Sequence, residues 1–181
     1  TAIANNGVPL NLSVIHKITD KEGNLVYEHT PSYKQRVLSS NSAEYVLSCM
    51  ETTAKNGTGS RANLRDVDIG VKTGTAQMAD KVHGGYSDTD FLSNCIAIFP
   101  VDKPQIVLYI VVEKAKGETY AGRIVAPVIG KAADVIIDHM GMSRGGAASL
   151  EHSGRITITG KNQIDNGVVL NVSSGTLAEG V

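Results

Sequence analysis

The run Val71-Lys72-Thr73-Gly74-Thr75-Ala76-Gln77 places one cation, two hydroxyl groups and a glycine in a segment that we expect to be extended. Side chains of a β-strand alternate between its two faces, so Thr73 and Thr75 share one face and Lys72 leaves from the other. The lysine stem is long enough to curl back, so the ammonium and both hydroxyls could converge on one carboxylate. Gly74 has no Cβ, so a substrate backbone could lie against this strand and pair with its N–H and C=O groups. The pattern predicts an edge strand that binds the anionic end of a peptide and supports acyl transfer.

Taken alone, Lys-Thr-Gly is short enough to arise by chance in a surface hairpin. Neighbouring segments favour the functional interpretation, and they are Ala4-Asn5-Asn6-Gly7, Asn56-Gly57-Thr58-Gly59, Phe99-Pro100-Val101-Asp102-Lys103-Pro104 and Ala126-Pro127. With these segments the chain, from Thr1 to about Met140, resembles the C-terminal part of the transpeptidase domain of a class B penicillin-binding protein. That family consists of serine acyltransferases that cross-link bacterial peptidoglycan. One departure is Val71, where many members carry glycine, and we expect it to alter strand packing and leave the chemistry of the motif intact.

The resemblance implies a two-stage acyl transfer. A serine attacks the D-alanyl-D-alanine end of a stem peptide, and an amine from a second peptide then releases the acyl group. Lys72 would lower the electrostatic cost near that serine and attract the terminal carboxylate, which Thr73 and Thr75 would hydrogen-bond beside Gly74. The backbone N–H of Thr75 would form half of the oxyanion hole. A β-lactam would be accepted as a mimic of the peptide end, and no metal or organic cofactor is implied.

The family has two further motifs, a Ser-x-x-Lys that carries the nucleophile and a Ser-x-Asn. No serine of this chain is followed by lysine three residues later, so we expect the nucleophile to lie upstream of Thr1 and the isolated chain to be inactive. Ser39-Ser40-Asn41 matches Ser-x-Asn, but it falls where the family begins a helix. Asn41 and Glu44 have the spacing of a capping box, so we interpret this match as structural.

Two other functions stay open. The chain could come from a D,D-carboxypeptidase or β-lactamase relative, in which water replaces the acceptor amine. It could also belong to a β-lactam sensor or a binding module without catalysis. The expected partners are peptidoglycan stem peptides, β-lactams and other cell-wall synthesis proteins. The expected place is the periplasmic or extracytoplasmic face of the inner (cytoplasmic) membrane, with an anchor in a segment absent from this chain.

Composition excludes several other classes of function. A length of 181 residues suits about one domain, and a formal net charge of −1 argues against a nucleic-acid partner. No apolar run is long enough to span a bilayer, so any membrane attachment needs an upstream anchor. The lysine of the motif precedes its glycine, which excludes a nucleotide P-loop. Metal binding is not expected, because no Cys, Asp or Glu lies at ligand spacing from the histidines, His16, His29, His83, His139 and His152.

The remaining pattern predicts an α+β fold in which an antiparallel sheet, with at least three core strands and a small hairpin, is flanked by helices. We expect a hairpin from Ser13–Thr19 and Asn24–His29, and an amphipathic helix from Ser40 to Lys55. Polar segments predict a loop over Asn56–Asp68 and a mobile loop over Met78–Thr89 beside the site.

Two apolar runs, Cys95–Phe99 and Ile106–Val112, predict strands covered on both faces, which form a three-stranded meander with the Lys72 strand. A helix from Ala126 to Met140, ended by Gly141, should cover one face of this meander. Cys49 and Cys95 both have the apolar neighbours of buried thiols.

We expect three parts in the chain. The resemblance implies that residues 1–141 are the C-terminal portion of the transpeptidase domain, and composition predicts a Gly- and Ser-rich linker at residues 142–152. Residues 153–181 form a short β appendage or the lead-in to a further module, with alternating stretches at Arg155–Thr159 and Val168–Ser173.

Overall fold

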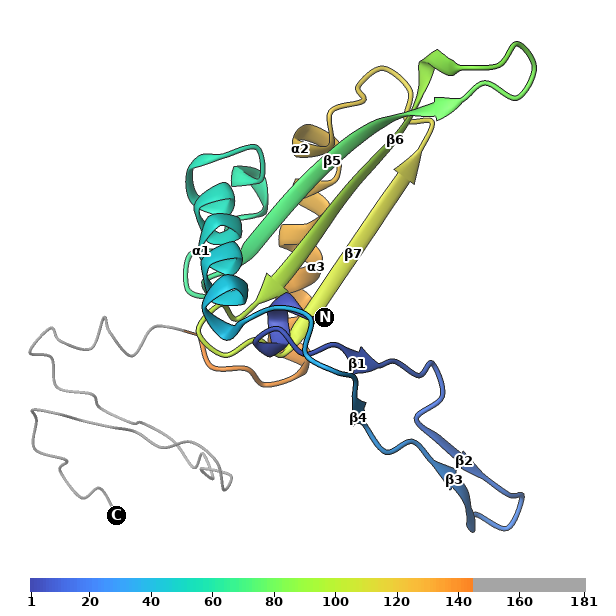
Figure 1. Cartoon of the computed structure of the whole chain (residues 1–181), viewed down its shortest axis with the longest axis vertical. Helices are drawn as coiled ribbons and strands as arrows, with labels where there is room; N and C mark the ends of the chain where they lie inside the picture. The colour runs from blue at the N-terminus through green and yellow to red at the C-terminus, as the bar shows by residue number, and fades with distance from the viewer. Residues whose placement is uncertain (145–181) are drawn as a thin grey trace, which may run out of the picture.

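The computed structural model describes residues 1–144, which form a three-stranded antiparallel sheet with helices against it and a protruding β arm (Figure 1). The strand order is β5 (Gly70–Ala79), β6 (Tyr86–Phe99) and β7 (Ile106–Glu113). The predicted α+β class and three-stranded meander are therefore confirmed. The predicted appendage at 153–181 and most of the predicted linker at 142–152 lie outside the described residues.

The loop predicted at Met78–Thr89 was wrong in its extent. Ala79 pairs with Tyr86, so only residues 80–85 connect the two strands, with Gly84 and Gly85 both at φ +77°. Polar residues are compatible with a strand where neither face packs on a core. The ends of β5 and β6 are such a region, because they project as a ribbon past the helices (Figure 1).

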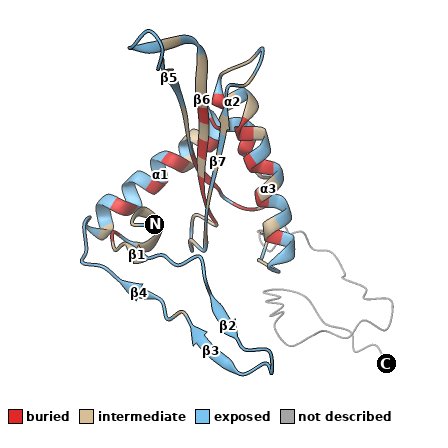
Figure 2. Ribbon diagram, turned by 90° about the vertical axis from the view of Figure 1, so that its right-hand side faces the viewer, coloured by how far each residue is buried: buried red, intermediate tan, exposed pale blue. Residues whose placement is uncertain are grey.

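One face of the sheet carries the larger apolar core (Figure 2). The helices on this side are α2 (Ala121–Ile124) and α3 (Ala126–His139), and a turn of 3-10 helix from the segment before β5, η2 (Ser60–Ala62), packs against them. The fully buried residues of this core include Val71, Cys95, Ala97, Phe99, Ile129, Ala133 and Ile137. Each large aliphatic side chain buried in this way stabilises the fold by about 1.5–3 kcal/mol. The predicted C-terminal helix is thus confirmed, and it packs on β6 and β7, while α2 contacts the Lys72 strand β5.

Helix α1 (Ser40–Asn56) packs on the other face, over the start of β5. Ser39 is its N-cap and accepts a hydrogen bond from the Ser42 N–H at 3.1 Å. The predicted cap at Asn41 was therefore wrong, because the helix begins earlier. The Ser39-Ser40-Asn41 match still falls at a helix start, as its structural interpretation requires.

The buried stripe of α1 is Ala43, Leu47, Met50 and Ala54, which leaves Cys49 outside it. The prediction that both thiols are buried was wrong for Cys49, which is exposed, and right for Cys95. Both cysteines are free.

Strand β7 is covered on one face, contrary to the prediction. Its residues alternate between half-buried and exposed, and the exposed fractions of Val107, Tyr109 and Val111 are 38%, 55% and 39%. The half-buried set packs toward α3, whereas α1 lies against β5 on the other side of the sheet. An unbroken apolar run could not reveal this difference, because it offers the same side chains to both faces.

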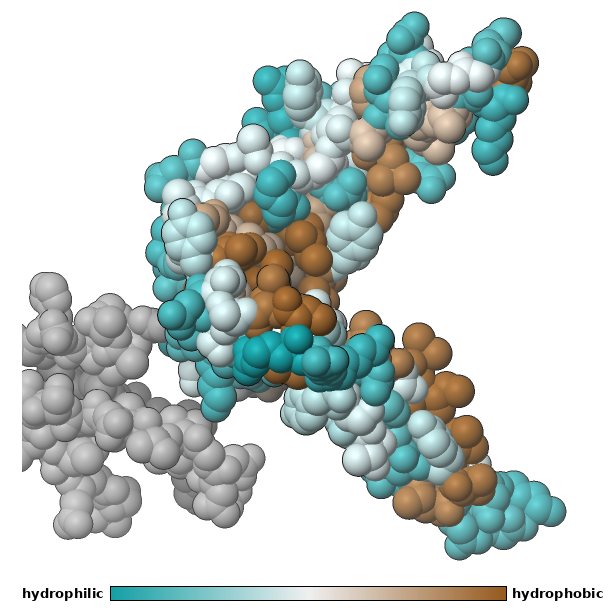
Figure 3. All heavy atoms as spheres, in the orientation of Figure 1, coloured by the Kyte–Doolittle hydropathy of each residue, from teal (hydrophilic) through white to brown (hydrophobic). Residues whose placement is uncertain are grey.

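The arm consists of two small antiparallel pairs, drawn below the sheet in Figure 1. Strands β2 (Lys17–Thr19) and β3 (Leu25–Glu28) form the predicted hairpin, whereas the pairing of β1 (Leu10–Asn11) with β4 (Ser32–Tyr33) was not predicted. A 3-10 turn, η1 (Ile3–Asn5), precedes the arm. All seven residues of β2 and β3 are exposed, and apolar side chains lie along the arm in Figure 3.

Close backbone packing connects α2 to the loop before β5. A Cβ added to Gly122 would lie 2.4 Å from the carbonyl oxygen of Thr58. We therefore expect Gly122→Ala to lower the free energy of unfolding by about 1–3 kcal/mol, the usual cost of overpacking. Denaturant titration measures this, with Ser60→Ala at an exposed position of η2 as a neutral control. An equally stable Gly122→Ala protein would contradict this contact.

Candidate active site at the open edge of β5

The four residues predicted to carry the site lie together on β5, which pairs only with β6 in the part of the chain that the structure describes. Lys72 and Thr75 are exposed, while Thr73 and Gly74 are half-buried. Opposite them on β6 are Cys95 to Thr73, Asn94 to Gly74 and Ser93 to Thr75. The other edge of β5 is therefore open to a ligand.

Lys72 reaches this open edge. Its Nζ donates a hydrogen bond to the backbone carbonyl of Thr73 at 2.6 Å. In an antiparallel ladder the N–H and C=O of one residue point to the same side. The backbone groups of Thr73, and of Thr75 two residues on, therefore face away from β6.

Strand β6 gives the same result independently. The carbonyl of Phe91 accepts from Lys114 N–H at the end of β7, so odd-numbered residues of β6 face β7. The backbone N–H and C=O of Asn94, an even-numbered residue, therefore point to β5, and those of its partner Gly74 point back to β6. The N–H of Thr75 is thus directed to the open edge, beside the Lys72 ammonium.

Both threonine hydroxyls lie on the face opposite the stem of Lys72. The Oγ1 atoms of Thr73 and Thr58 are 2.7 Å apart, and the Oγ1 of Thr75 accepts a hydrogen bond from the Ala121 N–H at 3.1 Å. A hydroxyl has one proton and two lone pairs, so Thr75 still has a proton to donate. The edge therefore offers a cation from one face, a hydroxyl donor from the other, and an N–H between them.

Gly74 fits closely against β6. A Cβ at this position would lie 2.8 Å from Oδ1 of the Asn94 side chain. Asn94 was not anticipated from the sequence, because cross-strand register cannot be read from the Lys-Thr-Gly run. A side chain at this position would require the Asn94 side chain to move.

Cys95 lies under the site without taking part in it. Burial raises the pKa of its thiol to about 11, although the Lys72 ammonium acts in the opposite direction. The thiol is therefore protonated near neutral pH and is a poor nucleophile. Cys95 is therefore unsuited to act as the nucleophile of an acyl transfer at this edge.

The turn that precedes α2 was also missed from sequence. Glu118 accepts from the N–H groups of Thr119 and Tyr120, both at 3.0 Å, and pairs with Arg123 at 2.9 Å. This turn places Ala121 beside Thr75. Its residues carry no motif, and only the register of β6 and β7 brings them to the site.

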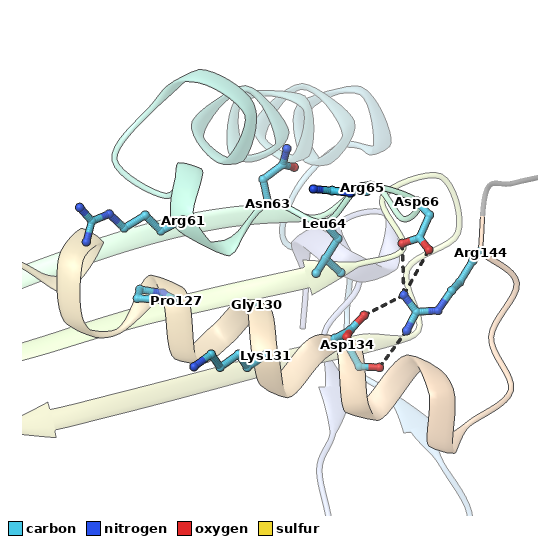
Figure 4. Close-up of a pocket in the computed structure, with 10 residues that line it drawn as sticks. All are labelled: Arg61, Asn63, Leu64, Arg65, Asp66, Pro127, Gly130, Lys131, Asp134 and Arg144. Carbon is cyan, nitrogen blue, oxygen red and sulfur yellow. Dashed lines mark hydrogen bonds and ion pairs between the residues drawn. The ribbon is translucent and has the colours of Figure 1, made fainter. Parts of the chain in front are cut away.

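A pocket of about 470 Å³ lies away from this edge, between α3 and the loop after η2 (Figure 4). Arg144 closes one end and bonds to Asp134 at 2.7 Å, Asp138 at 2.6 Å and Asp66 at 3.2 Å. These carboxylates, Asp134 first, raise the pKa of the guanidinium. None of the residues from Lys72 to Thr75 lines the pocket.

Within residues 1–144, no group of three or more His, Cys, Asp or Glu side chains is placed to hold a metal ion. No helix of this part is long and apolar enough to cross a membrane.

Comparisons with known proteins agree with the fold. The profile of the family described as "Penicillin binding protein transpeptidase domain" matches residues 1–134. Stage V sporulation protein D of Bacillus subtilis is 30% identical over 106 residues, which cover 58% of this chain and 16% of that protein. The peptidoglycan D,D-transpeptidase FtsI homolog of Mesostigma viride is 38% identical over 101 residues, which cover 53% of this chain and 17% of that protein.

Among solved structures, penicillin-binding protein 3 of Mycobacterium tuberculosis matches with a TM-score of 0.69 and 25% identity. The match covers 80% of this chain and 34% of that one. The chain belongs to the family of penicillin-binding protein transpeptidase domains. It spans about a third or less of the length of these relatives.

Proposed function

We propose that this chain is the part of a peptidoglycan D,D-transpeptidase that binds the D-alanyl-D-alanine end of a stem peptide and presents its carbonyl to a serine from elsewhere in the domain. The observation that carries this proposal is the open edge of β5, where the Lys72 ammonium, the Thr75 hydroxyl and the outward Thr75 N–H all lie within four residues of one strand. The peptide would add to β5 as an extra strand, with its backbone beside Gly74.

The roles of these groups follow from their chemistry. The Lys72 ammonium attracts the terminal carboxylate, and the hydroxyls of Thr73 and Thr75 hydrogen-bond it. The Thr75 N–H donates to the oxygen that becomes negative when the serine attacks, together with the N–H of the serine itself. An amine from a second stem peptide then takes the acyl group.

The same groups would bind a β-lactam, whose carboxylate replaces that of the peptide. The penicillin-binding protein 3 of Mycobacterium tuberculosis, 25% identical over the matched region, has been solved in complex with aztreonam. This supports binding of β-lactams by the protein that contains this chain. We further propose that this protein acts outside the cytoplasm, is held at the membrane by a segment outside this chain, and meets other cell-wall synthesis proteins there.

Fluorescent penicillin tests this function. A protein containing the complete domain should give a covalently labelled band after denaturing electrophoresis, whereas residues 1–181 alone should give none, because no serine here has the Ser-x-x-Lys spacing. The complete domain with that motif's serine replaced by alanine is the control. An adduct on residues 1–181, detected by mass spectrometry, would show that the nucleophile lies within this chain. Hydrolysis without transfer to an added amine would instead favour a carboxypeptidase or β-lactamase.

A further inference from the structure

The segment between β7 and α2 turns back to the open edge and contacts Thr75. Its contact is the Ala121 N–H, which donates to Thr75 Oγ1 at 3.1 Å across 46 residues of sequence. A four-residue helix such as α2 cannot hold this N–H in place by its own hydrogen bonds. Other groups must therefore fix the position of Ala121.

Ser93 is the first of these groups. It lies directly opposite Thr75 on β6, and its exposed fraction is 1%. Its hydroxyl donates to the backbone carbonyl of Thr119. Among the residues that the structure describes, Ser93 is the one polar side chain in the buried class. Because a buried hydroxyl without a hydrogen-bond partner is costly, this bond holds the Thr119 carbonyl against β6.

Glu118 is the second group. One carboxylate oxygen accepts from the N–H groups of Thr119 and Tyr120, and the other accepts from Arg123. The Arg123 guanidinium also lies over the Tyr120 ring, 5.8 Å from its centroid. These bonds, led by that from Tyr120, lower the pKa of Glu118, so the carboxylate is ionised near neutral pH. The turn is thus closed from inside by Glu118 and anchored to β6 by Ser93.

We propose that Ser93 and Glu118 are positioning residues, which hold the Ala121 N–H against the Thr75 hydroxyl and so direct the Thr75 proton to a bound carboxylate. With one lone pair of Oγ1 occupied by Ala121, the O–H must point away from α2, toward the ligand. If the turn loosens, the hydroxyl rotates freely, and the site loses part of its preference for a carboxylate. This inference rests on the proposed function.

The test compares two ligands that differ only in the carboxylate. Second-order acylation rates of the complete domain are measured with benzylpenicillin and with its methyl ester. Ser93→Ala and Glu118→Ala should each slow acylation by benzylpenicillin about fivefold to tenfold, the scale of one hydrogen bond, and leave the rate for the ester within about twofold. Glu118→Gln keeps an acceptor for the two N–H groups and should restore most of the selectivity.

Glu113→Ala, at the exposed end of β7, is the matched control and should change neither rate. An equal loss of both rates, or an unchanged ratio in stable Glu118→Ala protein, would overturn the positioning role. Glu118 is half-buried, whereas Ser93 is fully buried, so the Glu118 variant decides the question even if Ser93→Ala does not fold. If the unmodified domain were not acylated by either ligand, the proposed function itself would fail, which is a different outcome.

Discussion

Lys72→Ala should slow acylation of the complete domain by about 10²-fold or more, the scale of losing one preorganised electrostatic group. The ammonium lies at the open edge, 2.6 Å from the Thr73 carbonyl, where under the proposed function it would attract the ligand carboxylate and lie near the attacking serine. Because Lys72 is exposed, its loss should change the free energy of unfolding by no more than about 0.5 kcal/mol. The measurements are the second-order rates for benzylpenicillin and for a D-alanyl-D-alanine peptide, with thermal melts to verify folding.

Two further variants separate charge from bulk. Lys72→Arg keeps the charge but changes its shape and reach, so it should recover only part of the rate. Lys81→Ala removes an exposed lysine from the loop at residues 80–85 and should have little effect. A folded Lys72→Ala domain that reacts at nearly the normal rate would mean that β5 has a structural role only.

The candidate site could be predicted from the sequence because the information that defines it is local. Strand alternation fixed the faces of Lys72, Thr73 and Thr75 without any knowledge of the sheet. The long lysine stem allowed the return to the edge that the structure has. Residues that depend on register were missed: Ser93, Asn94 and Glu118 reach the site only because β6 and β7 pair as they do.

Burial was harder to predict than secondary structure. The run Ile106–Val112 has apolar residues at every position, yet only alternate ones face α3. Cys49 has apolar neighbours in sequence but lies outside the buried stripe of α1. In both cases burial depends on which neighbouring element packs against the residue, and the sequence of a single segment does not contain that information.

Val71 shows how a departure from the family pattern is accommodated. Its side chain is fully buried, and a Cβ added to Gly59 would lie 2.0 Å from its Cγ2. The valine therefore occupies the space that the absent side chain of Gly59 leaves. This agrees with the expectation that Val71 affects packing and leaves the motif itself in place.

Thr75 allows the hydroxyl and the backbone donor to be tested separately. Thr75→Ala removes the hydroxyl and keeps the N–H, so it should cost roughly 1.5 to 3 kcal/mol of transition-state stabilisation at most, as for a hydrogen bond to a charged group. Thr75→Pro also deletes the N–H, and acylation should fall by about a further 10²-fold to 10³-fold, the effect of losing one oxyanion donor.

The geometry of β5 makes the proline variant informative. The Thr75 N–H faces the open edge, so proline removes no hydrogen bond between β5 and β6, and edge strands tolerate it. Gln77→Pro is the control, because Gln77 lies two residues on with the same outward orientation and no predicted role. It should react at close to the normal rate, whereas Ala76→Pro, which faces β6, should lower the melting temperature. A folded Thr75→Pro domain that reacts as fast as Thr75→Ala would show that the Thr75 N–H is not an oxyanion donor, and the peptide carbonyl would then have to bind elsewhere on this edge.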